Sequence, residues 1–261
     1  MEVIVTESKS AAEMMAANII AAKIKNKPDA LLGLATGRTM ESLYSLLIEK
    51  HQSEGLDFSS LSSVNLDEYV GLPGTHEQSY RFYMNKHLFS QVNINPHNTH
   101  LPDGIAEDIP AECRRYEQVI KNKGGIDLQL LGIGTDGHIG FNEPGSSLVS
   151  RTRIKTLTKE TVDQNGAIFG DPDKVPRHAL TMGVGTIMDA HQVILLATGD
   201  SKAQIIADAV EGPITSWVTA SALQMHPSAI VIVDEEAAAK LKNYDYYKWA
   251  YENKPDWQRH F

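Results

Sequence analysis

Three titratable side chains, Asp136, His138 and Glu143, lie close together in one glycine-rich stretch of the chain. Histidine has an ordinary pKa near neutrality, and neighbouring carboxylates fix its tautomer and raise its basicity. An imidazole flanked by two carboxylates can move a proton between two atoms of a substrate. The plainer alternative is an ordinary surface turn, in which Asp136 and Gly137 form the bend and His138 is solvated.

The sequence before this cluster favours the chemical interpretation. An apolar run at residues 126–133 enters the turn through Gly132 and Gly134, and the stretch ends at Glu143 and Pro144. A buried strand followed by a glycine-rich loop is typical of the place where open α/β sheets bind ligands. The whole pattern therefore predicts an acid–base site at the end of a strand.

A second junction between a strand and a helix could bind an anion. It follows an apolar strand expected at residues 30–35 and precedes a helix expected at 40–51. Free backbone N–H groups and the helix dipole at such a place suit a phosphate, although threonine and glycine also serve turn geometry there. The residues of this junction are Thr36, Gly37, Arg38 and Thr39.

Two further junctions leave alternatives open. Lys202 follows a strand expected at residues 192–197, and it is either a point charge for a phosphate or a solvated lysine in a first helical turn. Asp67 and Glu68 form an acid pair at the end of a strand expected at 64–70. This pair either contains a catalytic base or provides a helix cap and surface charge.

The elements that must position these residues alternate along the chain. Such alternation predicts βαβ units and therefore an α/β fold. We expect an open, mainly parallel, doubly wound sheet flanked by helices, as in Rossmann-like folds. Ser10 is the expected cap of the first helix. An aromatic and aliphatic stripe in a helix expected at 78–89 indicates core packing rather than a ligand site. The expected strands cover residues 3–5, 30–35, 64–70, 127–133, 192–197 and 230–233, and the other expected helices cover 10–25, 40–51, 110–121 and 202–210.

Residues 150–178 are polar and weakly periodic. They could form a mobile lid over a site, or they could be a long surface connection. No repeat or linker divides the chain, so residues 1–261 are expected to form a single domain.

The composition excludes several classes of protein. The net charge is −9 without a run of lysine and arginine, which argues against a nucleic-acid partner, although a local cradle can still bind an anion. Cys113 is the only cysteine, which excludes a disulfide scaffold and a cysteine-based zinc site. The chain begins with an expected strand rather than a signal peptide, and it has no apolar run near the roughly 18 residues that span a bilayer. We therefore expect a cytoplasmic protein that does not enter a membrane.

The chain resembles the glucosamine-6-phosphate deaminase family in motifs that run nearly from end to end. This family converts glucosamine 6-phosphate and water into fructose 6-phosphate and ammonia, in amino-sugar catabolism. The motifs are L-G-L-A-T-G at 32–37, N-L-D-E-Y-V-G-L at 65–72, G-I-G-T-D-G-H-I-G-F-N-E-P at 132–144, S-R-T-R-I-K-T-L-T at 150–158, A-L-T-M-G-V-G-T at 179–186 and L-Q-M-H-P at 223–227.

Two other functions remain as alternatives. The related 6-phosphogluconolactonases share the fold and a D-G-H tripeptide, but there the histidine is typically followed by T-A-S-L-F-P rather than I-G-F-N-E-P. A non-catalytic sugar-phosphate sensing module of the same fold would need no complete acid–base set and usually carries a DNA-binding region.

The resemblance implies a role for each matching residue. Asp67 matches the base that moves a proton between C2 and C1 of the opened sugar, and His138 matches the residue that opens the ring. Asp136 and Glu143 match the carboxylates of the ring-opening group. The resemblance implies neither a cofactor nor a metal ion, and the chain carries no dinucleotide or metal signature.

The phosphate of the substrate is expected at Thr36, Gly37, Arg38 and Thr39 and at Lys202. Many relatives have glycine or serine where this chain has Arg38. Relatives of the longer bacterial type carry a phosphate-binding arginine in the lid where this chain has Ala167. Our hypothesis is that Arg38 partly replaces that cation, and the alternative is that it points to solvent.

Regulation and assembly are a separate question. In allosteric hexameric relatives, N-acetylglucosamine 6-phosphate binds at subunit interfaces, and Ser146, Arg153 and Lys155 match positions of that site. Arg153 and Lys155 could equally be surface charges of a strand. Residues 244–261, which include Trp257, depart from the longer type. A homo-oligomer is expected, and its size and response to the effector stay open.

Overall fold

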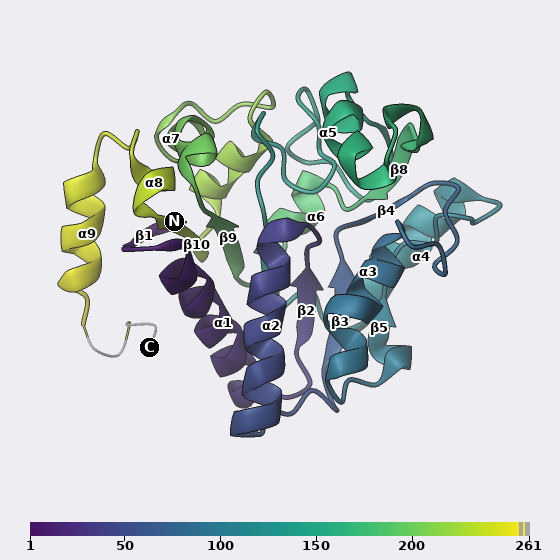
Figure 1. Cartoon of the computed structure of the whole chain (residues 1–261), viewed down its shortest axis with the longest axis horizontal. Coiled ribbons are helices and arrows are strands. Elements are labelled where there is room, and N and C mark those ends of the chain that lie inside the picture. The colour runs from purple at the N-terminus through teal and green to yellow at the C-terminus, as the bar shows by residue number, and fades with distance from the viewer. Residues whose placement is uncertain (256–257, 259–261) are drawn as a thin grey trace.

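The centre of the fold is a seven-stranded parallel sheet (Figure 1). The computed structural model describes residues 1–255 and 258, so Trp257 and part of the expected domain lie outside the described residues. In order across the sheet, the strands are β1 (Glu2–Thr6), β10 (Ala229–Asp234), β9 (Val193–Ala197), β6 (Leu128–Leu131), β2 (Leu31–Leu34), β3 (Ser62–Asn65) and β5 (Thr99–His100).

Helices connect the strands and cover the sheet, which confirms the predicted α/β class. Figure 1 shows α1 and α2 in front of the sheet, with α9 beside the edge at β1. The buried side chains of the strands and helices form one large apolar core. The α-helices are α1 (Lys9–Asn26), α2 (Arg38–Glu54), α3 (Tyr80–His87), α4 (Ile109–Asn122), α5 (Lys159–Phe169), α6 (Val184–Met188), α7 (Ala203–Glu211), α8 (Glu235–Ala238) and α9 (Tyr244–Glu252). Short 3-10 turns η1 (Phe89–Gln91), η2 (Pro96–Asn98), η3 (Pro172–Lys174), η4 (Asp200–Lys202) and η5 (Thr219–Met225) complete the chain.

The strand order reverses between β2 and β6. From β2 the chain proceeds outward through β3 to β5, and it then returns to the other side of β2 and proceeds outward through β6, β9 and β10. Such a switch point leaves a crevice outside the carboxyl ends of the strands. The segments with chemistry-bearing residues follow β9, β6, β2 and β3, which are four adjacent strands, so the fold brings them to one edge of the sheet.

The strand predicted at 64–70 is two strands in different sheets. β3 ends at Asn65, and β4 (Asp67–Tyr69) pairs antiparallel with β8 (His178–Thr181) in a second, three-stranded sheet. Leu66 joins the two sheets, because its N–H donates to Leu34 O at 3.1 Å and its carbonyl accepts from Met182 N at 2.6 Å. Asp67 therefore lies directly above the carboxyl ends of the parallel strands.

The polar segment 150–178 is a folded layer and not the irregular surface connection that we considered. It contains β7 (Arg153–Thr156), which pairs antiparallel with β8, and it contains α5 and η3. Figure 1 shows α5 and β8 above the carboxyl ends of the strands. A second apolar cluster holds the layer together: Tyr69, Phe141, Leu157, Val162, Val175 and Ala179.

The start of α1 differs from the prediction. Ser8, with an extended backbone, is the cap, and its side chain accepts the N–H of Ala11; Ser10 lies inside the first turn. Among the described residues, no helix is long and apolar enough to cross a membrane.

Candidate active site

His138 lies in the turn after β6 and contacts both predicted carboxylates. Its Nδ1 is 2.7 Å from Oδ1 of Asp136 and 3.5 Å from Oε2 of Glu143. The side chain of His138 is 17% exposed, so the alternative of a solvated histidine in a plain turn is wrong. Gly134 makes room for the ring, because a Cβ at this position would come within 2.4 Å of the imidazole.

Burial and charge act in opposite directions on this group. Burial lowers the pKa of His138, but contacts with Asp136 and Glu143 outweigh it and raise the pKa to about 9. Burial raises the pKa of each carboxyl group, and the contact with His138 reverses this effect, so both pKa values lie below their ordinary range. The group is therefore an imidazolium held between two carboxylates at neutral pH.

Backbone contacts fix the two carboxylates. Asp136 Oδ1 accepts the N–H of His138 at 3.1 Å, within the same turn. Glu143 is fully buried, and its Oε1 accepts the N–H of Thr158 at 3.2 Å. Thr158 caps α5, so the segment 150–178 helps to orient the carboxylate of Glu143.

Asp67 is the second acid–base group of the site. Burial and the neighbouring charge of Glu68 raise its pKa to about 8, while the charge of His138 and the N–H of Phe141 oppose this shift. Asp67 and His138, about seventy positions apart in the chain, are therefore close enough to interact electrostatically. A buried carboxylate with a raised pKa is a stronger base than a solvated one.

Glu68 has the structural role that was the alternative for the acid pair. Its carboxylate accepts the N–H groups of Tyr69, Tyr80 and Arg81, each at 2.9 Å. The last two belong to the first turn of α3. Asp67 therefore faces the site while Glu68 caps a helix, and neither is a surface charge.

The predicted phosphate loop follows β2 and begins α2. Gly37 precedes the helix with φ +114°, and Arg38 and Thr39 form the first turn. Thr36 and Thr39 are half-buried, whereas Arg38 is exposed. The first N–H groups of a helix have no partner within it, so this turn presents donors and a positive dipole end.

Lys202 is held toward the catalytic turn and is not a freely solvated lysine. Its Nζ donates to Ile133 O at 2.7 Å, which connects η4 to the end of β6. Burial lowers the pKa of Lys202, and the charge of Asp136 partly offsets this effect. An ammonium group has three donors, so two remain for an anion.

The positions matched to the effector site are near one another in the chain but differ in environment. Ser146 is buried, and its Oγ has no hydrogen-bond partner among the described residues. Arg153 donates through Nη1 to Asn142 Oδ1 at 2.9 Å, whereas its buried Nη2 has no such partner. Lys155 is half-buried on β7. Arg153 is thus tied to the catalytic turn and is more than a surface charge of a strand.

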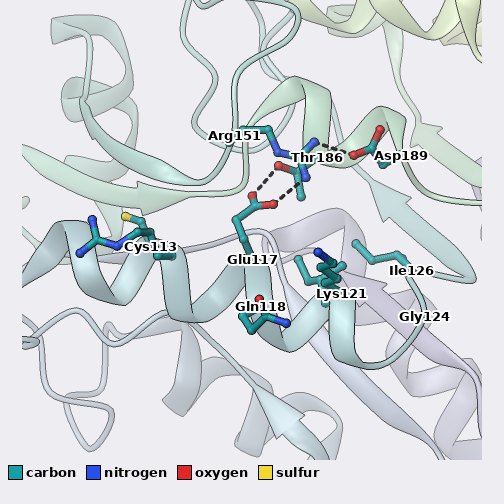
Figure 2. A pocket seen from close by; sticks show the side chains of 12 residues that line it. Cys113, Glu117, Gln118, Lys121, Gly124, Ile126, Arg151, Thr186 and Asp189 are labelled. Atoms are coloured by element: carbon teal, nitrogen blue, oxygen red, sulfur yellow. Dashed lines mark hydrogen bonds and ion pairs between the residues drawn. The ribbon is translucent and has the colours of Figure 1, made fainter.

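A cavity of about 690 Å³ lies away from these groups, between α4 and the start of β7 (Figure 2). Its lining includes none of the predicted catalytic residues. Glu117 points from α4 to its wall, where it accepts from Thr152 N at 2.8 Å and from the hydroxyls of Thr152 and Thr186 at 2.6 Å. Arg151 donates to Glu117 at 2.6 Å and also contacts Asp189. This network fastens the start of the lid segment to α4 and α6.

The group of Asp136, His138 and Glu143 also has the spacing of a metal site. The ligand atoms of Asp136, His138 and Glu143 lie within 4.8 Å of one another. However, the 2.7 Å contact of His138 with Asp136 has the length of a charge-assisted contact, which a proton satisfies. We interpret the group as a proton-transfer site, and a reaction without a metal or cofactor stays a prediction.

Comparison with known proteins agrees with this geometry. Residues 6–238 match the family described as glucosamine-6-phosphate isomerases/6-phosphogluconolactonase. The chain is 54% identical to the glucosamine-6-phosphate deaminase of Arthrobacter sp. (strain FB24), over 99% of both chains. It is 46% identical to a solved structure described as a monomeric glucosamine-6-phosphate deaminase, with a TM-score of 0.90 over 92% of this chain and 100% of the other. The chain belongs to the glucosamine-6-phosphate deaminase family.

The lactonase branch shares the fold with these deaminases. A 6-phosphogluconolactonase from Trypanosoma cruzi matches 92% of this chain and 97% of its own, with a TM-score of 0.72 and 21% identity. That likeness shows the fold and nothing of the activity. The family assignment rests instead on the 54% identity to a deaminase over nearly the whole chain.

Some supporting residues of the deaminase site were not predicted from the sequence. Asn142 is fully buried and donates to Ile139 O and Met182 O at 2.8 Å, which holds the catalytic turn against β8. Tyr83 belongs to the aromatic and aliphatic stripe predicted as core packing; it packs against the main core, and its hydroxyl also donates to Gly37 O at 2.8 Å. The position of Asn142 between Phe141 and Glu143 in the motif was an available signal, whereas the contact of Tyr83 depends on how α3 packs.

Proposed function

We propose that the protein converts glucosamine 6-phosphate into fructose 6-phosphate and ammonia. The observation that carries this proposal is the convergence of two acid–base groups, His138 with its carboxylates and the buried Asp67, at one edge of the sheet. The family relationship supports the same substrate and reaction. Because water is consumed when ammonia leaves, we also propose that the net reaction is hydrolytic.

The phosphate end of the substrate binds at the start of α2. Thr36, Gly37 and Thr39 supply hydroxyl and backbone donors, and Lys202 supplies a positive charge near the end of β6. A helix N-terminus and an ammonium group together bind a dianion in spite of the chain's net charge of −9.

Ring opening is assigned to His138. In its charged form, which Asp136 and Glu143 stabilise, His138 delivers its proton to the ring oxygen and then takes the proton of the C1 hydroxyl as a neutral imidazole. The raised pKa keeps the proton on His138 before this step and makes the neutral imidazole a good acceptor afterwards.

Isomerisation and loss of the amine are assigned to Asp67. Its carboxylate takes the proton from C2 of the open chain, which gives an enolamine, and returns the proton to C1. The resulting iminium group at C2 is hydrolysed by water, which leaves the ketone of fructose 6-phosphate and releases ammonia. Burial of Asp67 makes its carboxylate basic enough for a weakly acidic C–H.

The test is a parallel assay of two substrates. The purified protein should release ammonia and fructose 6-phosphate from glucosamine 6-phosphate, and it should release no acid from 6-phosphogluconolactone above the rate without protein. Acid release without ammonia would favour a lactonase, and the absence of both products would favour a sensing module.

Arg38 is proposed as the cation that compensates for Ala167. Arg38 is exposed at the start of α2 and has no hydrogen bond or ion pair with the described residues, so its guanidinium is free to reach a phosphate. Ala167 is exposed on α5 and has no charge. An Arg38→Ala variant should raise the KM for the sugar phosphate, and an unchanged KM would show that Arg38 points to solvent.

Residues 150–178 are proposed as the lid of a single-domain enzyme. α5 contacts the catalytic turn through Gln164 Nε2, which donates to Thr135 Oγ1 at 2.9 Å. Asn165 on the same helix donates to Tyr69 Oη at 2.9 Å, beside the strand of Asp67. The first contact joins two exposed side chains, whereas Tyr69 is buried in the second apolar cluster and not in the main core, which supports opening without disruption of the main core.

Effector binding and self-association are further proposals. The unpaired buried atoms of Ser146 and Arg153, with Lys155 nearby on β7, support binding of an anionic sugar such as N-acetylglucosamine 6-phosphate. We also propose a homo-oligomer in the cytoplasm, although the relative that is 46% identical is described as monomeric.

A further inference from the structure

Tyr83 reaches from α3 to the loop proposed to bind phosphate. Its hydroxyl donates to the carbonyl oxygen of Gly37 at 2.8 Å. The same oxygen accepts the N–H of Met40 at 2.9 Å, so two donors fix its direction. Gly37 has φ +114°, a conformation that glycine adopts readily and other residues do not. The loop therefore has a specific backbone conformation, and Tyr83 is one of the groups that hold it.

Fixing this carbonyl also fixes the next N–H group. The C=O of Gly37 and the N–H of Arg38 belong to one planar trans peptide, in which they point in opposite directions. With the carbonyl directed to Tyr83 and Met40, the N–H of Arg38 is directed out of the first turn of α2. That is the direction from which an anion approaches a helix N-terminus.

The first turn of α3 is also fastened to the strand of the base. Glu68, which follows Asp67, accepts the N–H groups of Tyr80 and Arg81 at the start of α3. The first turn of one short helix therefore joins the base to the phosphate loop: Glu68 holds its N–H groups, and Tyr83, at the end of this turn, extends to Gly37. The separation between the two ends of the site depends on this helix.

We propose that Tyr83 is a positioning residue for the phosphate group of the substrate, acting through the Gly37–Arg38 peptide. This inference rests on the proposed phosphate site. Tyr83 does not contact the reacting carbon atoms; it holds the donors that bind the far end of the sugar. Its loss should therefore weaken binding of any phosphate-bearing ligand and leave the chemical step unchanged.

The test is a Tyr83→Phe variant of the full-length protein. Phenylalanine keeps the aromatic ring, whose centroid lies 4.4 Å from that of His87, and removes only the hydroxyl. We expect the KM for glucosamine 6-phosphate and the inhibition constant of inorganic phosphate to rise together by about 3- to 10-fold, which is the range for one lost hydrogen bond. kcat and the pH profile should not change.

Two further variants make the result specific. Tyr247→Phe is the matched control, because it removes a tyrosine hydroxyl that donates to Glu211 on α7, away from the site, at 3.2 Å; it should change neither constant. Lys202→Met should raise both constants if the phosphate site is assigned correctly.

The outcomes separate the inference from the proposed function. If Lys202→Met raises both constants and Tyr83→Phe raises neither, or lowers kcat instead, the role of Tyr83 is wrong and the phosphate site stands. A rise in KM without a rise in the inhibition constant of phosphate also overturns the role of Tyr83. If neither variant affects phosphate inhibition, the proposed phosphate site itself is wrong.

Discussion

At the scale of single residues, the proposed reaction uses two groups, Asp67 and His138, whose pKa values are set by different causes. Burial is the main cause that raises the pKa of Asp67 to about 8. The pKa of His138 is raised to about 9, because the two neighbouring carboxylates outweigh the effect of its burial. The base must be ionised and the imidazole must hold a proton to deliver to the ring oxygen, so both conditions are met best between these values.

The pH dependence of kcat/KM should therefore be bell-shaped, with limbs near pH 8 and pH 9. An Asp136→Asn variant removes one of the charges that favour the imidazolium, so the pKa of His138 should fall and the descending limb should move to lower pH. Initial rates measured from pH 6 to 10 check this prediction. A variant whose descending limb stays in place would show that His138 is not the group responsible.

At the scale of elements, the start of the proposed lid, residues 150–178, is held by a single carboxylate of α4. Glu117 accepts hydrogen bonds from Thr152 and Thr186 and pairs with Arg151, so α4, α6 and the segment just before β7 meet at one side chain. Figure 2 shows Glu117 with Arg151 and Thr186. If Glu117 is removed, its hydroxyl and amide donors lose their acceptor at a half-buried place, where water replaces it less well than at the surface. The network therefore stabilises the point where the lid leaves the main body.

Glu117→Ala should lower the free energy of unfolding by about 2 to 4 kcal/mol, because several donors lose their acceptor at once. Urea denaturation measures this change. Glu54→Ala is the matched control, since Glu54 is an exposed carboxylate that pairs with Lys50 of its own helix and with Lys25 of α1, and it should leave stability nearly unchanged. Equal stability losses in the two variants would contradict the role of the network.

Most elements were predictable because their apolar periodicity is local. The strands at 3–5, 192–197 and 230–233 and the helix at 40–51 each appear near the predicted place, and so does the turn that holds Asp136, His138 and Glu143. The split at Leu66 was not predictable, because one continuous extended stretch pairs with two different sheets. The cap of α1 was misplaced by two residues, since Ser8 and Ser10 are equally good caps by type.

The sequence predicted which residues form the site better than it predicted their pKa values. The motifs indicated Asp67 and His138, but their pKa values depend on groups contributed by other segments. Thr158, which orients Glu143, belongs to the lid segment, whose polar sequence predicted little regular structure. Burial and distant contacts of this kind have no local sequence signal.

At the scale of the whole molecule, the strand order explains why distant motifs form one site. Four adjacent parallel strands end at the same edge, on both sides of the point where their order reverses. The structural likeness to the lactonases shows that this arrangement serves more than one chemistry. The deaminase assignment therefore rests on the residues placed at that edge rather than on the fold.

The effector positions predict how the whole molecule responds to a second sugar phosphate. If Ser146, Arg153 and Lys155 bind N-acetylglucosamine 6-phosphate, its addition should lower the substrate concentration that gives half-maximal rate. Sedimentation velocity of the same sample should show an assembly larger than the monomer. A hyperbolic curve that the effector does not change, together with a monomeric protein, would contradict both proposals.

Asp67→Asn provides the most direct test of the proposed reaction. Asparagine keeps the shape of the side chain but cannot take the proton from C2. Because burial raises the pKa of Asp67 to about 8, its ionisation is unfavourable to the fold, so stability should fall as pH rises from about 4 to about 8 in the wild type and less so in the variant. A variant at least as stable as the wild type at pH 9 would therefore show that lost activity is not lost folding.

The decisive measurement is ammonia release from glucosamine 6-phosphate by the wild type and by this variant, side by side. The wild type should release one ammonia for each fructose 6-phosphate, and Asp67→Asn should reduce kcat by about 100-fold or more. A wild type that releases no ammonia, or a folded variant that releases it at nearly the wild-type rate, would contradict the assignment of Asp67 as the isomerising base of a deaminase.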